Sequence, residues 1–351
     1  MLKRSKYISA LGVLALLVGC QSVIQENVTE QITAKSINNK DVELTARTIK
    51  GWQDHLKSAK SGGELQKDCA PFFKLAKENV KGSVMLFHGY SACPQQYNEV
   101  AEELADIGYN VFVPLLPGHG RVPVKSGDKV IDNSENLPDV KSTVIYEKFA
   151  ANMGLMLKDE PGTKVIGGIS VGGVIASRSM LDNPDIYDRG FLMAPFFNAA
   201  GSISLLIPAV GAIMPNKSMG WGEKCENQRR LGRAGYCDFK VTNIAAVRRF
   251  GLDTLKDVGN IKKPMQIIGV EKDTAASNSA IAEAVKKLPN SDACFFAEGA
   301  SHSMLSRQDN VSTNMFWLAP LKQQMIRYID TGKGFDIGSK SEHGLGQCRS
   351  Y

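Results

Sequence analysis

The chain has 351 residues, which allows one large domain or two small ones and is long enough to bury a core. Its composition, 43% hydrophobic and 22% charged, is typical of a globular protein and excludes disordered, collagen-like and multi-span membrane chains. The 42 basic and 36 acidic side chains are too evenly balanced to indicate a nucleic-acid partner.

Residues 1–19 are predicted to be a targeting segment rather than part of the fold. A basic stretch, Met1 to Lys6, precedes an apolar run, Ile8 to Val18, that is too short to span a bilayer stably. The ending Leu-Val-Gly-Cys20 resembles the lipobox of bacterial lipoproteins, which implies cleavage before Cys20 and a membrane anchor of acyl chains on that residue. Gln21 then implies sorting to the outer membrane in a Gram-negative cell. The alternative is an ordinary secretory signal with a chance cysteine.

Six cysteines remain after Cys20, and an exported compartment permits disulfides between them. We expect a local clip between Cys225 and Cys237, a bridge from Cys69 to Cys93 around one strand, and a bridge that ties the tail through Cys294 and Cys348. The alternative is six unpaired buried thiols. No CxxC or HxxxH spacing occurs, so we expect no zinc site.

Residues 20–63 are polar, lack a strong hydrophobic period and are predicted to form a tether with an N-terminal layer. Strands and helices then alternate. Predicted strands cover 83–87, 110–116, 164–169, 190–194, 265–270 and 293–296, and predicted helices cover 97–104, 144–157, 281–288 and 311–330. This order predicts a mostly parallel α/β sheet with ligands at the carboxyl ends of the strands.

The motif Gly168-Ile169-Ser170-Val171-Gly172 lies directly between a predicted strand and a predicted helix. A hydroxyl nucleophile must project from a tight turn so that its base and its substrate can approach from different sides. The flanking glycines suit a place where strand and helix backbones crowd each other. The alternative, Ser170 as a helix N-cap in a nucleotide-binding turn, lacks a supporting GxGxxG or GxxxxGK[ST] motif.

A serine hydroxyl at neutral pH needs a base, and His302 is the histidine that follows a late strand. The acid that orients it should lie in the loop after the preceding strand. We predict Asp273 for this role, with Glu271 as the rival two residues closer to the strand.

Acyl transfer also needs donors for the developing oxyanion. We predict the backbone N–H of Val171 and that of Tyr90, which lies in the turn after the first core strand. His88 and Gly89 are expected to shape that turn. His119, in a similar loop after the next strand, is expected to be structural, with substrate contact as the alternative.

Segments 88–91, 116–120 and 168–172, together with Asp273 and His302, resemble the α/β-hydrolase fold, closest to its carboxylesterase and monoacylglycerol-lipase-like branch. The resemblance covers about residues 81–330 and has no counterpart for 21–80. It implies a serine esterase without metal or cofactor, in which Ser170 attacks an ester carbonyl, His302 moves the proton and water releases the acyl group.

The core is expected over residues 64–197 and 262–332, and a C-terminal tail over 333–351. The long segment 198–261 between two strands implies a cap in this fold. Its apolar run, 204–214, would line an acyl pocket, dip into lipid or form the cap's own core. We expect a membrane-tethered hydrolase of lipid-like or medium-chain esters; the alternatives are an acyltransferase with the same triad and a catalytically silent ligand-binding lipoprotein.

Overall fold

The computed structural model describes residues 44–127, 129–201, 203–296, 300–310, 315–334 and 348–350. The predicted leader, Cys20, the tether up to residue 43 and most of the tail lie outside these ranges.

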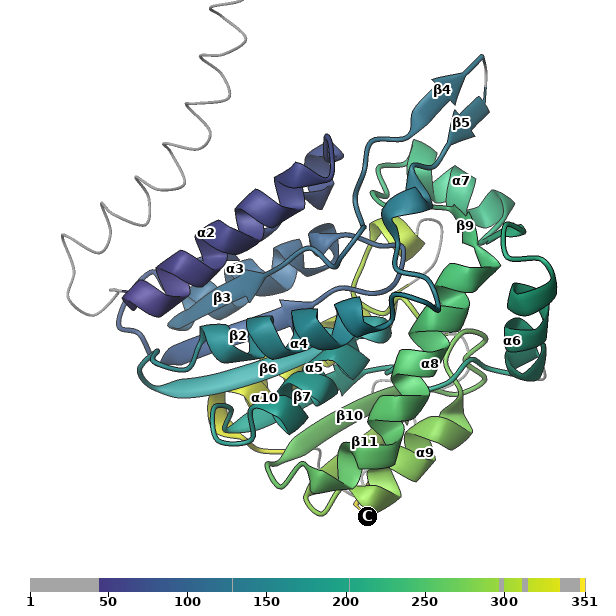
Figure 1. The fold of residues 1–351 in the computed structure, drawn as a ribbon. Helices are drawn as coiled ribbons and strands as arrows, with labels where there is room; N and C mark the ends of the chain where they lie inside the picture. The colour runs from purple at the N-terminus through teal and green to yellow at the C-terminus, as the bar shows by residue number, and fades with distance from the viewer. Residues whose placement is uncertain are drawn as a thin grey trace, which may run out of the picture.

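In the described part of the chain, an eight-stranded sheet forms the centre of the fold, with strand order β1-β3-β2-β6-β7-β10-β11-β12 (Figure 1). Its strands are β1 (Phe72–Lys74), β2 (Gly82–Phe87), β3 (Tyr109–Val113), β6 (Thr163–Ile169), β7 (Arg189–Met193), β10 (Met265–Val270), β11 (Ser291–Phe296) and β12 (Cys348–Ser350). The inner strands are parallel, whereas the edge strands β1 and β12 are antiparallel to their neighbours. The predicted fold class is therefore confirmed, and the carboxyl ends of the inner strands meet at one edge.

Helices cover both faces of this sheet (Figure 1). One face carries α3 (Asn98–Asp106) and α10 (Leu318–Thr331), and the other carries α2 (Ala46–Ser61), α4 (Val144–Met156), α5 (Val171–Asp182), α8 (Val241–Asp257) and α9 (Asn278–Lys287). Successive side chains of a strand point to opposite faces. Met85 and Phe87 of β2 accordingly enter one hydrophobic core, and Val84 and Leu86 enter the other. Burial on both faces explains why this strand is apolar without alternation.

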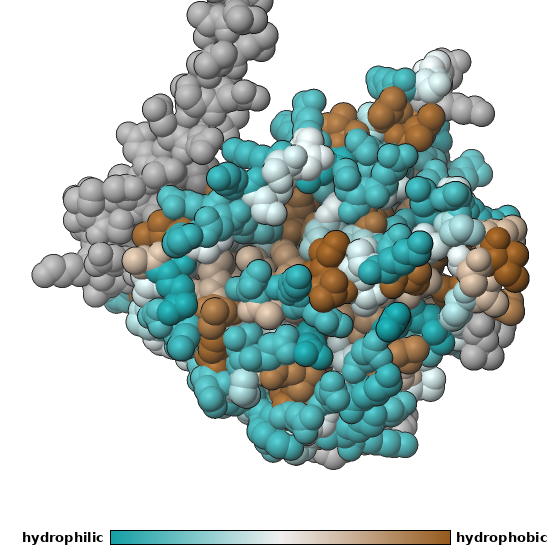
Figure 2. All heavy atoms as spheres, viewed as in Figure 1, coloured by the Kyte–Doolittle hydropathy of each residue, from teal (hydrophilic) through white to brown (hydrophobic). Residues whose placement is uncertain are grey.

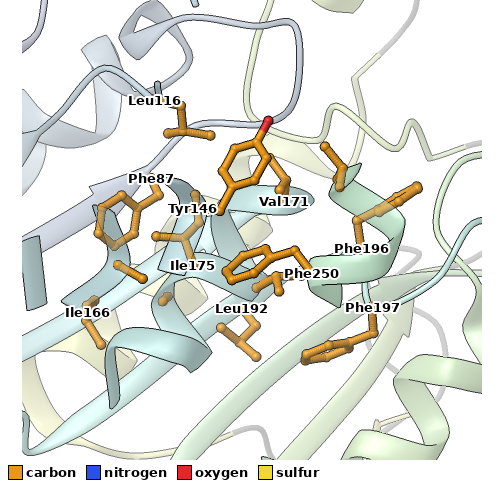
Figure 3. Packing of buried hydrophobic residues seen from close by; sticks show 14 of the residues in the cluster. Phe87, Leu116, Tyr146, Ile166, Val171, Ile175, Leu192, Phe196, Phe197 and Phe250 are labelled. Atoms are coloured by element: carbon orange, nitrogen blue, oxygen red, sulfur yellow. The ribbon is translucent and has the colours of Figure 1, made fainter. Parts of the chain in front are cut away.

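The larger core lies between the sheet and α4, α5 and α8 (Figure 3). Phe87 and Ile166 come from neighbouring strands and pack near Ile175 of α5 (Figure 3). Tyr146 of α4 and Phe250 of α8 stack with ring centroids 5.5 Å apart. This packing holds α5 against the sheet directly behind the turn that carries Ser170.

In two predicted elements, a proline explains why an end differs from the one expected. The strand predicted over 110–116 ends at Val113, because Pro114 has no N–H to continue the ladder. The helix predicted from residue 311 begins at Leu318, and residues 311–314 lie outside the described part. Pro320 is tolerated in the first turn of α10, where no intrahelical partner exists, but would break the interior of a longer helix.

The N-terminal layer contains a helix that was not predicted. In α2, Thr48, Trp52, His55 and Ala59 are buried at helical spacing, although most of the other side chains are polar. The Trp52 ring packs against Phe112 of β3 with centroids 5.6 Å apart. A stripe of one aromatic and three small or polar residues is too weakly hydrophobic to reveal this helix by its pattern alone.

The segment between β7 and β10, which was predicted to form a cap, divides into two parts. It contains α6 (Ile203–Ile213), β8 (Ser218–Gly220), α7 (Glu223–Arg230), β9 (Asp238–Lys240) and α8. α8 packs against α5 and so belongs to the helical layer. We call residues 218–240 the cap segment.

Exposed hydrophobic side chains include two groups on the surface (Figure 2). One is the hairpin of β4 (Val124–Ser126) and β5 (Lys129–Ile131), and the other is α6 with the residue after it. The exposed side chains are Val124, Val130 and Ile131 of the hairpin and Leu206, Ile213 and Met214 of the α6 region.

Two of the expected disulfides are present, Cys69–Cys93 and Cys225–Cys237. Cys294 is also disulfide-bonded, and β12 pairs residue 348 with it in register, but the side chain of Cys348 lies outside the described residues. Within the described ranges, no helix combines the length and apolar character needed to cross a bilayer.

Candidate active site

Ser170 occupies a strained turn between β6 and α5. Its φ of 56° and ψ of −122° lie in a region that residues with side chains rarely adopt, at a cost on the order of 1–3 kcal/mol. The neighbouring backbone holds the turn: Ser170 N–H donates to Met193 C=O at 2.8 Å, and Ser170 C=O accepts from Phe196 N–H at 3.0 Å. Such a turn lifts the hydroxyl away from the strand and the helix, as the GxSxG motif predicted.

The glycines of the motif are required by close backbone contacts. A Cβ at Gly172 would lie 2.0 Å from Phe87 O, and one at Gly168 would lie 2.2 Å from the carbonyl carbon of Gly172. Both contacts are far shorter than any side chain tolerates, so β6, α5 and the end of β2 can meet only without side chains here. The predicted reason for these glycines is confirmed.

His302 and Asp273 are brought together by loops that follow β11 and β10. His302 Nδ1 and Asp273 Oδ2 are 2.7 Å apart, and the Asp273 side chain is inaccessible to solvent while His302 remains 20% exposed. Because Nδ1 donates to a carboxylate, Nε2 is left as the nitrogen that can accept a proton. The rival acid Glu271 is exposed and lies outside the cavity described below.

The surroundings of Asp273 keep it ionised despite its burial. Burial alone would raise the pKa of this carboxyl. The hydrogen bond and charge of His302, with the backbone N–H groups of Ala275 and Ala276 at 2.7 and 3.0 Å from Oδ1, outweigh that effect and lower its pKa. Asp273 is thus a fixed anion beside the imidazole.

The predicted oxyanion donors belong to the residue after Ser170 and to the turn after β2. Neither the N–H of Tyr90 nor that of Val171 donates a hydrogen bond to another described residue. A Cβ at Gly89 would lie 3.6 Å from the Ser170 Cβ, so the turn after β2 touches the nucleophile. Val171 opens α5, whose N-terminal dipole favours negative charge.

A cavity of about 540 Å³ lies where these loops meet. Ser170, Asp273 and His302 all contribute to its lining. No hydrogen bond joins Ser170 to His302 among the described residues; such contacts are often loose before substrate binds. Apolar lining comes from Ile169, Phe196, Ile244 and Val270, and polar lining from Gln96, Lys224, Gln228, Arg233, Asp309 and Asn310. No described side chain of α6 or of the apolar run 204–214 lines this cavity.

His88 and His119 are structural, and neither lines the cavity. His88 Nε2 accepts from Leu116 N–H at 3.0 Å, and His119 Nε2 accepts from Ser91 N–H at 3.1 Å. Burial lowers the pKa of His119 to about 4 and that of His88 well below its ordinary value. Both rings are therefore neutral and hold the two loops beside the nucleophile.

Three polar residues of the cavity have no sequence signal that marks them. Gln96 and Arg233 are buried and both hydrogen-bonded to the buried Asp309, yet the three residues come from distant segments and belong to no motif. Only proximity in the fold identifies them. Among the described residues, no group of three potential metal ligands occurs.

Comparisons with known proteins agree with this architecture. The sequence profile of the Hydrolase_4 family, described as serine aminopeptidase, S33, matches residues 78–309. A monoglyceride lipase homologue from monkeypox virus is 31% identical over 146 residues, 40% of this chain and 49% of the viral protein. A monoacylglycerol lipase from Mycolicibacterium smegmatis is 30% identical over 135 residues, 38% of this chain and 45% of that enzyme. The chain thus spans about half the length of the curated relatives it matches.

The structural likeness extends further along the chain than the sequence likeness. The crystal structure of a soluble variant of monoglyceride lipase from Saccharomyces cerevisiae superposes with a TM-score of 0.55, covering 78% of this chain and 96% of that chain at 16% identity. At that identity the likeness concerns the fold alone. Because the family match includes the Ser170 turn, the Asp273 loop and His302, the chain belongs to the Hydrolase_4 (serine aminopeptidase, S33) family and has the α/β-hydrolase fold.

Proposed function

We propose that this protein is a carboxylic-ester hydrolase that works through Ser170, His302 and Asp273. The observation that carries the proposal is the strained Ser170 turn, which opens into the same cavity as the hydrogen-bonded Asp273–His302 pair. A hydroxyl, an imidazole with one nitrogen free, and an ionised acid behind it are the parts that acyl transfer requires.

The reaction proceeds in two halves. Ser170 Oγ attacks the ester carbonyl carbon and its proton passes to His302 Nε2, while the N–H groups of Tyr90 and Val171 stabilise the oxyanion. The tetrahedral species collapses, and His302 returns the proton to the departing alcohol. Water then attacks the acyl-serine with His302 again as base, which releases the acid and restores Ser170.

The cavity lining favours an ester with an apolar acyl part and a polar alcohol part. Ile169, Phe196 and Val270 offer an apolar wall, whereas Lys224 and Gln228 on the cap side offer polar partners. The names of the two lipases above support a monoacylglycerol-like substrate. The family description, serine aminopeptidase, suggests an amide substrate instead.

Covalent labelling tests the proposal directly. A fluorophosphonate probe should label the folded wild-type protein at Ser170, identified by mass spectrometry of the labelled peptide, and Ser170→Ala should abolish labelling. An unlabelled, folded wild type would support a catalytically silent binding protein. Hydrolysis of a monoacylglycerol without cleavage of an aminoacyl arylamide would support the ester assignment, and transfer to added glycerol would identify an acyltransferase.

We also propose that Cys20 anchors the protein to a membrane, on the outer membrane of a Gram-negative cell. The lipobox-like Leu-Val-Gly-Cys sequence supports this, and the exposed apolar side chains of the β4–β5 hairpin and α6 suit a protein that works next to lipid (Figure 2). In cell fractionation, Cys20→Ser should move the protein from the membrane to the soluble fraction. Continued membrane association of the variant would contradict the anchor.

A further inference from the structure

The turn that carries the proposed oxyanion donor Tyr90 contains a second residue in an unusual conformation. Ser91, directly after Tyr90, has a φ of 58° and is fully buried. Residues other than glycine rarely adopt this conformation unless their surroundings impose it. His119 supplies one restraint, since Ser91 N–H donates to its Nε2 at 3.1 Å.

The remaining polar groups of Ser91 are bound by the cap segment. Ser91 Oγ accepts from Trp221 Nε1 at 2.6 Å. Ser91 C=O accepts from Tyr236 N–H at 2.8 Å and from Arg233 Nη2 at 3.3 Å. A Cβ at Gly235 would lie 2.1 Å from Ser91 O, so the cap backbone approaches this carbonyl as closely as glycine allows.

Arg233 also reaches the other end of the turn through a buried relay. Arg233 Nε donates to Asp309 Oδ1 at 2.6 Å, in an ion pair whose side chains are 7% and 6% exposed. Asp309 Oδ2 accepts from Gln96 Nε2 at 3.0 Å, and Gln96 Oε1 accepts from Gly89 N–H at 2.8 Å. Arg233 therefore holds both neighbours of Tyr90. It binds Ser91 directly, and it reaches Gly89 through the side chains of Asp309 and Gln96.

Asp309 connects the same relay to the loop of His302. It lies in a short helical turn, Gln308–Asn310, and its own C=O accepts from Gln228 Nε2 of the cap segment. The adjacent Asn310 Nδ2 donates to Ser303 C=O at 2.7 Å, next to His302. The cap segment, the turn after β2 and the histidine loop thus share one buried polar network.

We propose that the cap segment positions the oxyanion turn, with Arg233 as the central positioning residue, so that the cap completes the catalytic site as well as covering it. The inference rests on the proposed function, because it assigns the N–H of Tyr90 to the oxyanion. A donor stabilises that charge only when it is aimed at the position the oxygen occupies in the transition state. Loss of the cap contacts frees Ser91 and, through the relay, Gly89, so the Gly89–Tyr90 peptide that carries the N–H of Tyr90 is no longer held in place.

A matched pair of substitutions tests this role. Arg229, four residues before Arg233, also forms an ion pair with a buried aspartate, Asp132, but lies outside the cavity and does not contact the turn. Arg233→Lys keeps a charge near Asp309 but loses the fork that binds Ser91 and Tyr236 together. Arg229→Lys is the same change in the same segment, but Arg229 makes no contact with the turn and reaches it only through Asp132 and the backbone of Cys237.

The kinetic readout is chosen to separate positioning from stability. With p-nitrophenyl butyrate, Arg233→Lys should lower kcat about 10- to 100-fold with KM within about threefold, less than deletion of a whole donor causes. A trifluoromethyl ketone, which forms a tetrahedral adduct with the serine, should bind more weakly by the same factor. The unreactive methyl ketone of the same chain should bind unchanged. Arg229→Lys should keep kcat within about twofold even where its melting temperature falls.

Equal losses of kcat in the two variants, or a rise in KM alone for Arg233→Lys, would overturn the inference while leaving the proposed function standing. A wild type that reacts with neither the fluorophosphonate nor the ester would overturn both. If Arg233→Lys does not fold, Trp221→Phe serves instead: it keeps a ring against Phe239 but removes the donor to Ser91 Oγ. It should lower kcat and ketone affinity together, and unchanged values would overturn the inference.

Discussion

Histidines in this molecule differ in role because their partners differ. His302 pairs with a buried carboxylate and keeps part of its ring exposed, so its second nitrogen remains usable for proton transfer. His55, in α2, accepts from Leu115 N–H at 3.1 Å and is buried, and that burial lowers its pKa to about 4. A ring bound to a backbone N–H and held neutral is a structural hydrogen-bond acceptor rather than a base.

The acid behind His302 can be tested with its neighbour as control. Asp273→Asn should lower kcat about 10³- to 10⁴-fold with little change in KM, because an amide facing Nδ1 favours the wrong imidazole tautomer. Glu271→Gln removes a carboxylate two residues away that is exposed, and kcat should stay within about twofold of wild type. Steady-state kinetics on a soluble ester provide the measurement, and the opposite ranking would make Glu271 the acid.

At the scale of elements, the junction of β2, β6 and α5 is the most tightly constrained part of the site. Gly172 lets the start of α5 approach the end of β2, and Gly168 lets the end of β6 approach the start of α5. The core beneath them, with α4 and α8 against α5, prevents the helix from moving away (Figure 3). Strain at Ser170 persists because this packing over-determines the turn.

Two glycines in helices should respond in opposite directions to the same substitution. Gly172→Ala places a Cβ against Phe87 O and should destabilise the fold by about 3 kcal/mol or more, because the contact is with backbone. Gly211→Ala in α6 meets only ordinary contacts near 3.9 Å and should stabilise the helix by up to about 1 kcal/mol. Urea unfolding of both variants measures the difference, and a tolerated Gly172→Ala would contradict the crowding argument.

The clip within the cap segment should matter for both stability and activity. Cys225 and Cys237 are 12 residues apart and bracket Arg233 and Tyr236. The double variant Cys225→Ser/Cys237→Ser should lose about 2–4 kcal/mol of stability, measured by urea unfolding, because its unfolded chain is less constrained. Its kcat should fall as the contacts with Ser91 loosen. A less stable double variant with wild-type kcat would show that the cap contacts hold without the clip.

For the molecule as a whole, buried neutral histidines link stability to pH. Their pKa values in the folded state lie below the ordinary value near 6.5, so the unfolded chain binds more protons between about pH 4 and pH 6.5. The contribution to stability is therefore complete above about pH 6.5 and is lost as the pH falls toward 4.

His55→Gln tests this link at one site. The glutamine oxygen can still accept from Leu115 N–H, but it does not titrate. The unfolding free energy of the variant should fall less steeply between pH 6.5 and pH 4.5 than that of wild type, by about 1.4 kcal/mol per pH unit. Urea unfolding across this range measures the slope, and parallel curves would show that His55 does not supply it.

Much of the fold was predictable because its signals are local. Apolar runs revealed the inner strands, the order of strands and helices indicated a parallel sheet, and the glycines around Ser170 indicated a crowded turn. The weakly apolar α2 was missed, and the prolines at residues 114 and 320 moved two boundaries. The helix α2 was missed because its burial depends on the tertiary surface that it covers.

The sequence by itself determined the chemistry that is available: a serine at a strand-to-helix junction, a late histidine, and an acidic residue in the loop before it. Only the tertiary structure decided which acid faces His302, since Asp273 and Glu271 differ by two loop positions whose directions depend on packing. It also decided that Arg233 reaches both ends of the turn around Tyr90. These hydrogen bonds join residues 29, 76 and 142 positions apart and have no periodic pattern in the chain, because folding alone brings those residues together.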